Sequence, residues 1–157
     1  MADITHGTWI KDGKAVDAVY QSGVKIYGRN LIKGGSHQTI LADNSNSNNF
    51  RIFYTGLIPN QTYTLSMIAS LTGSSNSLVT IALYSNDIGA PALVIHTMVA
   101  DGTTRKWQFT VPNNGLQLLI YAGKQFNTTG IGLDIKQLKL ETGDQTAFSI
   151  APEDILN

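Results

Sequence analysis

Apolar and polar residues alternate with a period of two through much of the chain, and turn-forming residues interrupt the alternation about every ten residues. Successive side chains of a β-strand point to opposite faces of the sheet, so this period indicates strands that turn one face to a core. The alternation is clearest over residues 78–84 and 116–122. Short strands bounded by turns at this spacing are typical of a sandwich or a barrel. The pattern therefore predicts an all-β fold.

Turn and spacing signals refine this prediction. Asp12-Gly13 separates two β-compatible runs, and such a pair favours a two-residue hairpin because both turn positions need a positive φ. The apolar spacing slips by one residue between Ile135 and Leu138, as a β-bulge would produce. From Asn30 to Leu140 we expect about eight strands, which fit a jelly-roll β-sandwich of two antiparallel sheets. The clearest of them cover residues 50–54, 62–69, 78–84, 93–99, 106–111, 116–122 and 133–140.

The sequence is expected to divide into three segments. Residues 1–28 would form a short N-terminal β-hairpin or linker, 29–143 the jelly roll, and 144–157 an exit linker with a short helix near its end. No run approaches the roughly 18 uninterrupted apolar residues of a membrane-spanning helix. The first residues also lack the basic and apolar regions of a secretory signal.

The charge composition of the chain limits the classes of partner that it is expected to bind. Charged residues make up 14% of the 157 residues, and 11 basic residues balance 11 acidic ones. A chain without net charge lacks the electrostatic footprint of a nucleic-acid binder or of a protein that lies on anionic lipid. We therefore expect no nucleic-acid partner and no membrane insertion. Thr, Asn, Ser and Gln supply the polarity instead, and the lack of cysteine excludes thiolate metal sites.

Catalytic groups are scarce. The chain has no cysteine nucleophile and no Gly-x-Ser-x-Gly motif, and its three histidines stand in unrelated contexts. His96 follows an apolar run and is expected to be structural, and Trp107 is expected in the core. Glycosidases need two carboxylates that flank the scissile bond, but the only glutamates, Glu141 and Glu153, lie in or near the tail. We expect no enzyme, and a cell-wall hydrolase is the least favoured hypothesis.

Recognition of a sugar needs aromatic rings for its C–H faces and neutral or hydrogen-bonding groups for its hydroxyls. If Val79, Ile81 and Leu83 point inward, then Tyr84 points out of the core. The same parity argument places Gln117 and Tyr121 outward on the next strand, and Arg51 outward if Ile52 points inward. The candidate saccharide-binding residues are therefore Tyr84, Tyr121, Gln117 and Arg51. The alternative is that each is an ordinary surface residue.

Asp134 differs from most other aspartates because it lies inside a predicted strand instead of a turn. It is either an outward-facing strand residue or a ligand of a structural Ca²⁺ between the sheets, where loop carbonyls would complete an oxygen shell.

Two terminal stretches carry a resemblance to a known group of proteins. The first is GTWIKDGKAVD at 7–17, continued by VKIYGRNL at 24–31, and the second is IKQLKLETG at 135–143, followed by TAFSIAPEDIL at 146–156. Both resemble segments of tail and baseplate proteins from siphophages that infect lactobacilli and related Gram-positive bacteria. Between them, GLIPNQTYTLS at 56–66 and WQFTV at 107–111 resemble strands of jelly-roll carbohydrate-binding modules.

The resemblance implies a carbohydrate-binding module of a phage tail or baseplate, located in the virion. Its ligand would be host cell-wall polysaccharide or a teichoic-acid-type glycan, and its other partners would be further tail or baseplate proteins. Related modules often place an acidic residue near a metal at the position of Asp134, which favours the Ca²⁺ hypothesis. The alternative function is a structural or assembly module without sugar affinity, which would form a homo-oligomer through the exposed edges of the N-terminal hairpin.

Overall fold

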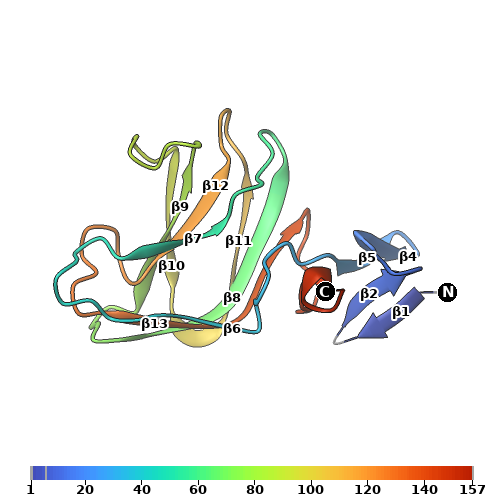
Figure 1. Cartoon of the computed structure of the whole chain (residues 1–157), viewed down its shortest axis with the longest axis horizontal. Helices are drawn as coiled ribbons and strands as arrows, with labels where there is room; N and C mark the ends of the chain where they lie inside the picture. Colours follow the sequence, from blue (N-terminus) through green and yellow to red (C-terminus); the bar gives the residue numbers. More distant parts are fainter. Residues whose placement is uncertain (1, 6, 157) are drawn as a thin grey trace.

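The computed structural model describes residues 2–5 and 7–156 (Figure 1). Two four-stranded sheets pack face to face, so the predicted all-β sandwich is confirmed. Sheet I has the strand order β10-β9-β12-β7 and sheet II the order β11-β8-β13-β6, and all pairs in both are antiparallel. Their strands are β6 (His37–Ile40), β7 (Phe50–Tyr54), β8 (Thr62–Thr72), β9 (Leu78–Tyr84), β10 (Val94–Val99), β11 (Asp101–Thr110), β12 (Gln117–Tyr121) and β13 (Gly132–Thr142).

Most of the predicted strands and turns are confirmed. Asp12 and Gly13 both have a positive φ, as the two-residue hairpin requires. The register of β13 against β8 shifts between Lys136 and Lys139, which confirms the bulge. β6 was not among the predicted strands, because His37–Ile40 is short and lacks an alternating apolar set. No helix in the described part of the chain has the length and apolar character that crossing a membrane requires.

The core has two layers. The main core lies between the sheets and contains Val79, Ile81 and Leu83 from β9 together with Leu118 and Ile120 from β12. The opposite parity of the same strands forms an outer cluster on sheet I, which consists of Ala82, Tyr84, Leu119 and Tyr121, with Phe50, Ile52 and Ala92 packed against it. Sheet I is therefore apolar on both faces, which explains why its central strands are buried from end to end.

Trp107 and His96 close one edge of the sandwich. Their rings stack with centroids 4.3 Å apart and an interplanar angle of 3°, and Trp107 also stacks on Phe109. Trp107 is partly buried against the main core, as predicted. Burial lowers the pKa of His96, so the neutral imidazole predominates at pH 7. Both residues serve packing, which agrees with the structural role expected of His96.

The chain termini form a small annex beside the sandwich, at one end of the molecule in Figure 1. It comprises residues 144–156, with the 3-10 helix η1 (Pro152–Asp154), and the strands β1 (Ala2–Thr5), β2 (Thr8–Lys11), β3 (Lys14–Ala15), β4 (Ala18–Gln21) and β5 (Val24–Gly28). Thr8 donates a hydrogen bond to the carbonyl of Ile150. The segment expected as an exit linker therefore packs against the N-terminal strands, whereas the division of the chain at residues 28 and 143 stays a prediction.

A buried ionic cluster joins the annex to sheet II. Lys139 and Glu141 lie on the outer face of β13 and are fully buried. Lys139 donates to Thr146 Oγ1 at 2.9 Å and to the carbonyl of Ala147 at 2.7 Å. Glu141 receives hydrogen bonds from the Thr146 backbone and hydroxyl, and Lys25 of β5 lies 3.3 Å from it. Burial lowers the pKa of Lys139 to about 8, an effect that the Glu141 carboxylate opposes and the Lys25 charge reinforces.

Candidate binding pocket

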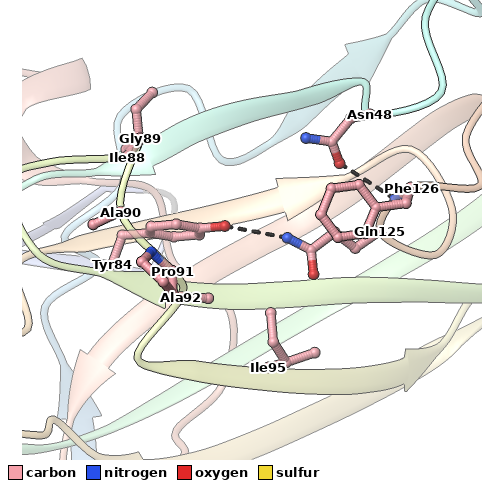
Figure 2. Close-up of a pocket in the computed structure, with 10 residues that line it drawn as sticks. All are labelled: Asn48, Tyr84, Ile88, Gly89, Ala90, Pro91, Ala92, Ile95, Gln125 and Phe126. Atoms are coloured by element: carbon pink, nitrogen blue, oxygen red, sulfur yellow. Dashed lines mark hydrogen bonds between the residues drawn. The ribbon is translucent and has the colours of Figure 1, made fainter.

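A pocket of about 490 Å³ opens on the outer face of sheet I (Figure 2). Strands β9 and β10 contribute Tyr84 and Ile95, and three loops complete the wall. The lining residues, which we call the tyrosine pocket, are Asn48, Tyr84, Ile88, Gly89, Ala90, Pro91, Ala92, Ile95, Gln125 and Phe126. None of them carries a charge. A volume in this range with mostly apolar walls and a few convergent polar groups is typical of a small-ligand site.

Two tyrosines and one glutamine form the polar centre of this face. The hydroxyls of Tyr84 and Tyr121 lie 3.3 Å apart, and the side-chain amide of Gln125 donates to both, at 3.1 and 3.2 Å. Burial, together with the hydrogen bond to Tyr84, raises the pKa of Tyr121, so the Tyr121 hydroxyl stays neutral at physiological pH. The arrangement therefore presents uncharged donors and acceptors.

The outward parity expected for Tyr84 and Tyr121 is confirmed, but their expected exposure is not. Tyr84 is 6% and Tyr121 1% exposed, because the loops before β10 and after β12 cover the outer face. Tyr84 lines the pocket, whereas Tyr121 lies beneath it and acts through its hydrogen bonds. Gln117 also faces outward but is 8% exposed, and its amide donates to the carbonyl of Ser85. It holds the β9–β10 loop and does not line the pocket.

The prediction for Arg51 is wrong in its parity. Ile52 belongs to the outer cluster and Phe53 packs on the main core, so the parity expected of these two residues is reversed, whereas Tyr54 packs on the main core as expected. Arg51 donates to Gln38 Oε1 at 2.8 Å and to the Thr39 carbonyl at 2.6 Å, both on β6 of the other sheet. The parity was misread because β7 carries bulky apolar residues on both faces. Arg51 bridges the sandwich edge and lies outside the pocket.

The Ca²⁺ hypothesis expected Asp134 to lie between the sheets, but it does not. Its neighbours Leu133 and Ile135 point into the main core, so Asp134 faces outward from sheet II. Its carboxylate lies 2.5 Å from Nε2 of His37 on β6. Among the residues that the structure describes, no three His, Cys, Asp or Glu side chains gather where they could hold a metal ion. The place assigned to the site is therefore wrong, and calcium binding itself stays a prediction.

Of the ten lining residues the sequence singled out Tyr84 alone, and the most exposed aromatic residue that it missed is Phe126. Phe126 is 66% exposed, and its backbone has φ 67°, a left-handed conformation that is strained for a bulky residue. The backbone N–H of Phe126 donates to Asn48 Oδ1, which ties the loop after β12 to the loop before β7 (Figure 2). A strained residue persists only where the surrounding structure holds it in place, and such residues cluster at functional sites. The loop thus keeps an aromatic ring in solvent beside the pocket.

No family model and no curated protein matches the sequence. Among solved structures, the fold is similar to a family 4 carbohydrate-binding module, with a TM-score of 0.51 and 16% identity, over 81% of this chain and 76% of that chain. A family 16 carbohydrate-binding module aligns with a TM-score of 0.39 and 16% identity, over 69% of this chain and 72% of that one. A protein of Bacillus endospore appendages, which form disulfide-linked pili, aligns with a TM-score of 0.36 and 20% identity, over 69% and 84% of the two chains.

The first of these likenesses supports the predicted jelly-roll fold. At 16% identity it is evidence for the fold alone, and the two lower TM-scores are too low to support an argument.

Proposed function

We propose that this chain is a non-catalytic module that binds an uncharged saccharide in the tyrosine pocket. The observation that carries the proposal is the exposed ring of Phe126, which is held in a strained conformation beside a pocket with no charged lining residue. A sugar ring presents apolar C–H faces, which stack on an aromatic ring, and hydroxyls, which bond to amides and phenols. Phe126 supplies the first kind of contact, and Tyr84, Gln125 and Asn48 supply the second.

The chemistry of the lining favours a neutral ligand over an anionic one. No Lys or Arg lines the pocket to compensate a phosphate or carboxylate, and a buried charge without a partner is costly. A neutral cell-wall polysaccharide therefore fits better than a phosphate-rich teichoic acid. The same lining offers no acid–base pair for hydrolysis, so the proposed role is binding without turnover. The family 4 carbohydrate-binding module with a similar fold supports the saccharide class.

The biological setting is a finer part of the proposal. The terminal stretches resemble phage tail and baseplate proteins, so we place the module in the virion of a phage, where it adheres to the wall polysaccharide of a Gram-positive host. Other tail or baseplate proteins would carry it. Many copies on one virion would raise the avidity of a weak site without any new contact.

A structural or assembly role is the second candidate, and one observation favours it. Tyr20, Val24 and Ile26 of the β4–β5 hairpin are 64%, 63% and 43% exposed. An apolar two-stranded hairpin with free edges is suited to association with another chain. Stable oligomers in light scattering, together with no glycan affinity, would favour this role.

A glycan array with the fluorescently labelled chain tests the proposal. The array should hold neutral wall polysaccharides of Gram-positive bacteria beside phosphate-bearing teichoic acids. We expect signal on neutral spots, and soluble polysaccharide from the same spots should displace the chain from whole cells. Binding to the phosphate-bearing spots alone, or to no spot, would refute the proposed ligand class.

A further inference from the structure

We propose that a second pocket, at the end of the sandwich around Asn86 and Asn114, is a further saccharide subsite, so that the chain binds an extended polymer across two pockets. This inference rests on the proposed function and deepens it, because it sets the ligand class as a polysaccharide chain instead of a terminal sugar. The end pocket has a volume of about 540 Å³ and lies where the loops before β8, after β9 and before β12 meet.

The end pocket resembles the tyrosine pocket in its chemistry. Leu57, Pro59 and Leu116 give it apolar walls, and Ser85, Asn86 and Asn114 give it neutral polar groups. None of its lining residues is charged. Two pockets of similar size and the same uncharged character are what successive units of a neutral polymer require.

The walls of the end pocket are tied together by hydrogen bonds between its loops. The backbone N–H of Leu57 donates to the Leu116 carbonyl at 3.0 Å, and the Leu116 N–H donates to the Tyr84 carbonyl at 2.9 Å. The Gln117 side chain adds a bond of 2.8 Å to the Ser85 carbonyl. A site that is already assembled loses less conformational entropy on binding. The pocket is therefore preorganised by groups that leave the asparagine side chains free.

The side-chain carboxamides of Asn86 and Asn114 have hydrogen-bonding groups that the fold does not use. Within the described residues, neither Asn86 nor Asn114 makes a side-chain hydrogen bond, whereas Asn46 and Asn49 use theirs to hold their loop. A carboxamide offers two donors and one acceptor. Asn86 and Asn114 thus present unused groups of the type that bonds to sugar hydroxyls.

One loop separates the two pockets and lines both. Tyr84 and Ile88 border the tyrosine pocket, while Ser85 and Asn86 between them border the end pocket. Because Ser85 and Asn86 directly follow Tyr84 along the chain, one loop segment contributes to the walls of both pockets. Tyr84 takes part on both sides, with its hydroxyl on the tyrosine pocket and its carbonyl bonded to Leu116 in the wall of the end pocket. A polymer that leaves one pocket can enter the other over this loop.

Chain-length dependence tests the inference. The probes are a neutral wall polysaccharide of a Gram-positive bacterium and the disaccharide that mild acid releases from this polysaccharide. The variant combines Asn86→Ala with Asn114→Gly, because Asn114 has φ 68° and glycine accepts that backbone. Asn113→Ala, in the same turn but outside the pocket, is the matched control.

We expect the double variant to lose about tenfold in affinity for the polysaccharide and to keep its affinity for the disaccharide, as linked subsites require. In ¹⁵N-labelled protein, the polysaccharide should also shift the side-chain amide signals of Asn86 and Asn114. Wild-type affinity of the double variant for the polysaccharide would overturn the subsite and leave the proposed function intact. If neither probe binds, both the subsite and the proposed function are overturned. If the asparagine variant loses polysaccharide binding but a Phe126 variant keeps it, the tyrosine pocket alone is overturned.

Discussion

The hydroxyl of Tyr84 lies 3.3 Å from that of Tyr121, and the Gln125 amide bonds to both. These three side chains come from β9, from β12 and from the loop after β12, so the triad fixes that loop against sheet I. The same loop presents Phe126 to solvent. The buried triad therefore positions the exposed ring. Tyr121 only holds the loop, whereas Tyr84 and Gln125 hold the loop and also line the pocket.

Removal of the Tyr84 or the Tyr121 hydroxyl distinguishes holding of the loop from contact with the ligand. Tyr84→Phe and Tyr121→Phe should each lower the free energy of unfolding by about 1 kcal/mol, because each deletes a buried hydrogen bond. Only Tyr84 lines the pocket, so only Tyr84→Phe should weaken saccharide binding severalfold. Urea denaturation and calorimetric titration measure the two effects. Equal losses of affinity in both variants would argue against a direct contact from Tyr84.

Phe126→Gly should stabilise the fold while it removes binding. Glycine accepts a positive φ without the cost of about 1 kcal/mol or more that an L-residue meets there, and the ring that it deletes is largely exposed. Phe126→Ala keeps the backbone strain and is the matched comparison. We expect the glycine variant to unfold at a higher temperature than the alanine variant, with saccharide binding lost in both. A glycine variant no more stable than the alanine variant would contradict the strain.

The stability of the fold should rise with pH in the alkaline range. The pKa of Lys139 is lowered to about 8 in the folded chain from 10.5. Between these values the unfolded chain binds more protons, so the free energy of unfolding increases with pH. The charged groups that act on Lys139 are Glu141, whose carboxylate lies 3.8 Å from Nζ, and Lys25, which pairs with the same carboxylate. Burial also raises the pKa of Tyr27, Tyr54 and Tyr121 above 10.0, and their opposing effect grows as the tyrosines of the unfolded chain ionise, so it stays small below about pH 9.5.

Urea denaturation from about pH 8 to pH 9.5 measures this dependence. Wild type should gain stability over the range, and Lys139→Met should gain much less because it lacks the titrating group. Equal slopes for the two proteins would show that Lys139 does not titrate there.

The Thr146 hydroxyl should be a large contributor to the attachment of the annex. It receives hydrogen bonds from Lys139 Nζ and the Gly28 N–H and donates to Glu141 Oε1. Thr146→Val keeps the shape but leaves buried charged groups short of a partner, at a cost of about 2–3 kcal/mol. Thr97→Val, at an exposed position of β10, is the control in the same denaturation assay. Equal effects of the two substitutions would contradict the role of the hydroxyl.

The sequence alone was sufficient to predict which side chains face the main core on strands with a regular alternation. On β9 and β12 it identified which residues face the main core, including the outward parity of Tyr84 and Tyr121. It was insufficient on β7, where apolar residues occupy both parities and the register against β12 shifts between Leu118 and Leu119. Local pattern cannot resolve the facing of a strand that carries apolar residues on both faces.

The pocket itself depends on contacts that no local pattern encodes. Asn48 and Phe126 meet across 78 residues of sequence, and the covering loops turn an expected open face into a bounded pocket. The burial of Lys139 and Glu141 likewise has no local signal in the sequence, because the annex that buries them comes from both ends of the chain. Phe126 carried one usable signal, since it is a bulky aromatic residue in a long polar loop.

Calorimetric titration of the Phe126→Ala variant with a neutral wall polysaccharide tests the central claim most directly. Tyr20→Ala, which removes an equally exposed ring from the annex, is the matched control. We predict that Phe126→Ala lowers the affinity for the polysaccharide at least about tenfold. The loss of one aromatic ring on which a nucleic-acid base stacks costs roughly 1–3 kcal/mol, and we expect a similar loss for a sugar ring. Tyr20→Ala should bind like wild type. Unchanged affinity in Phe126→Ala, with the loss in Tyr20→Ala instead, would contradict the account.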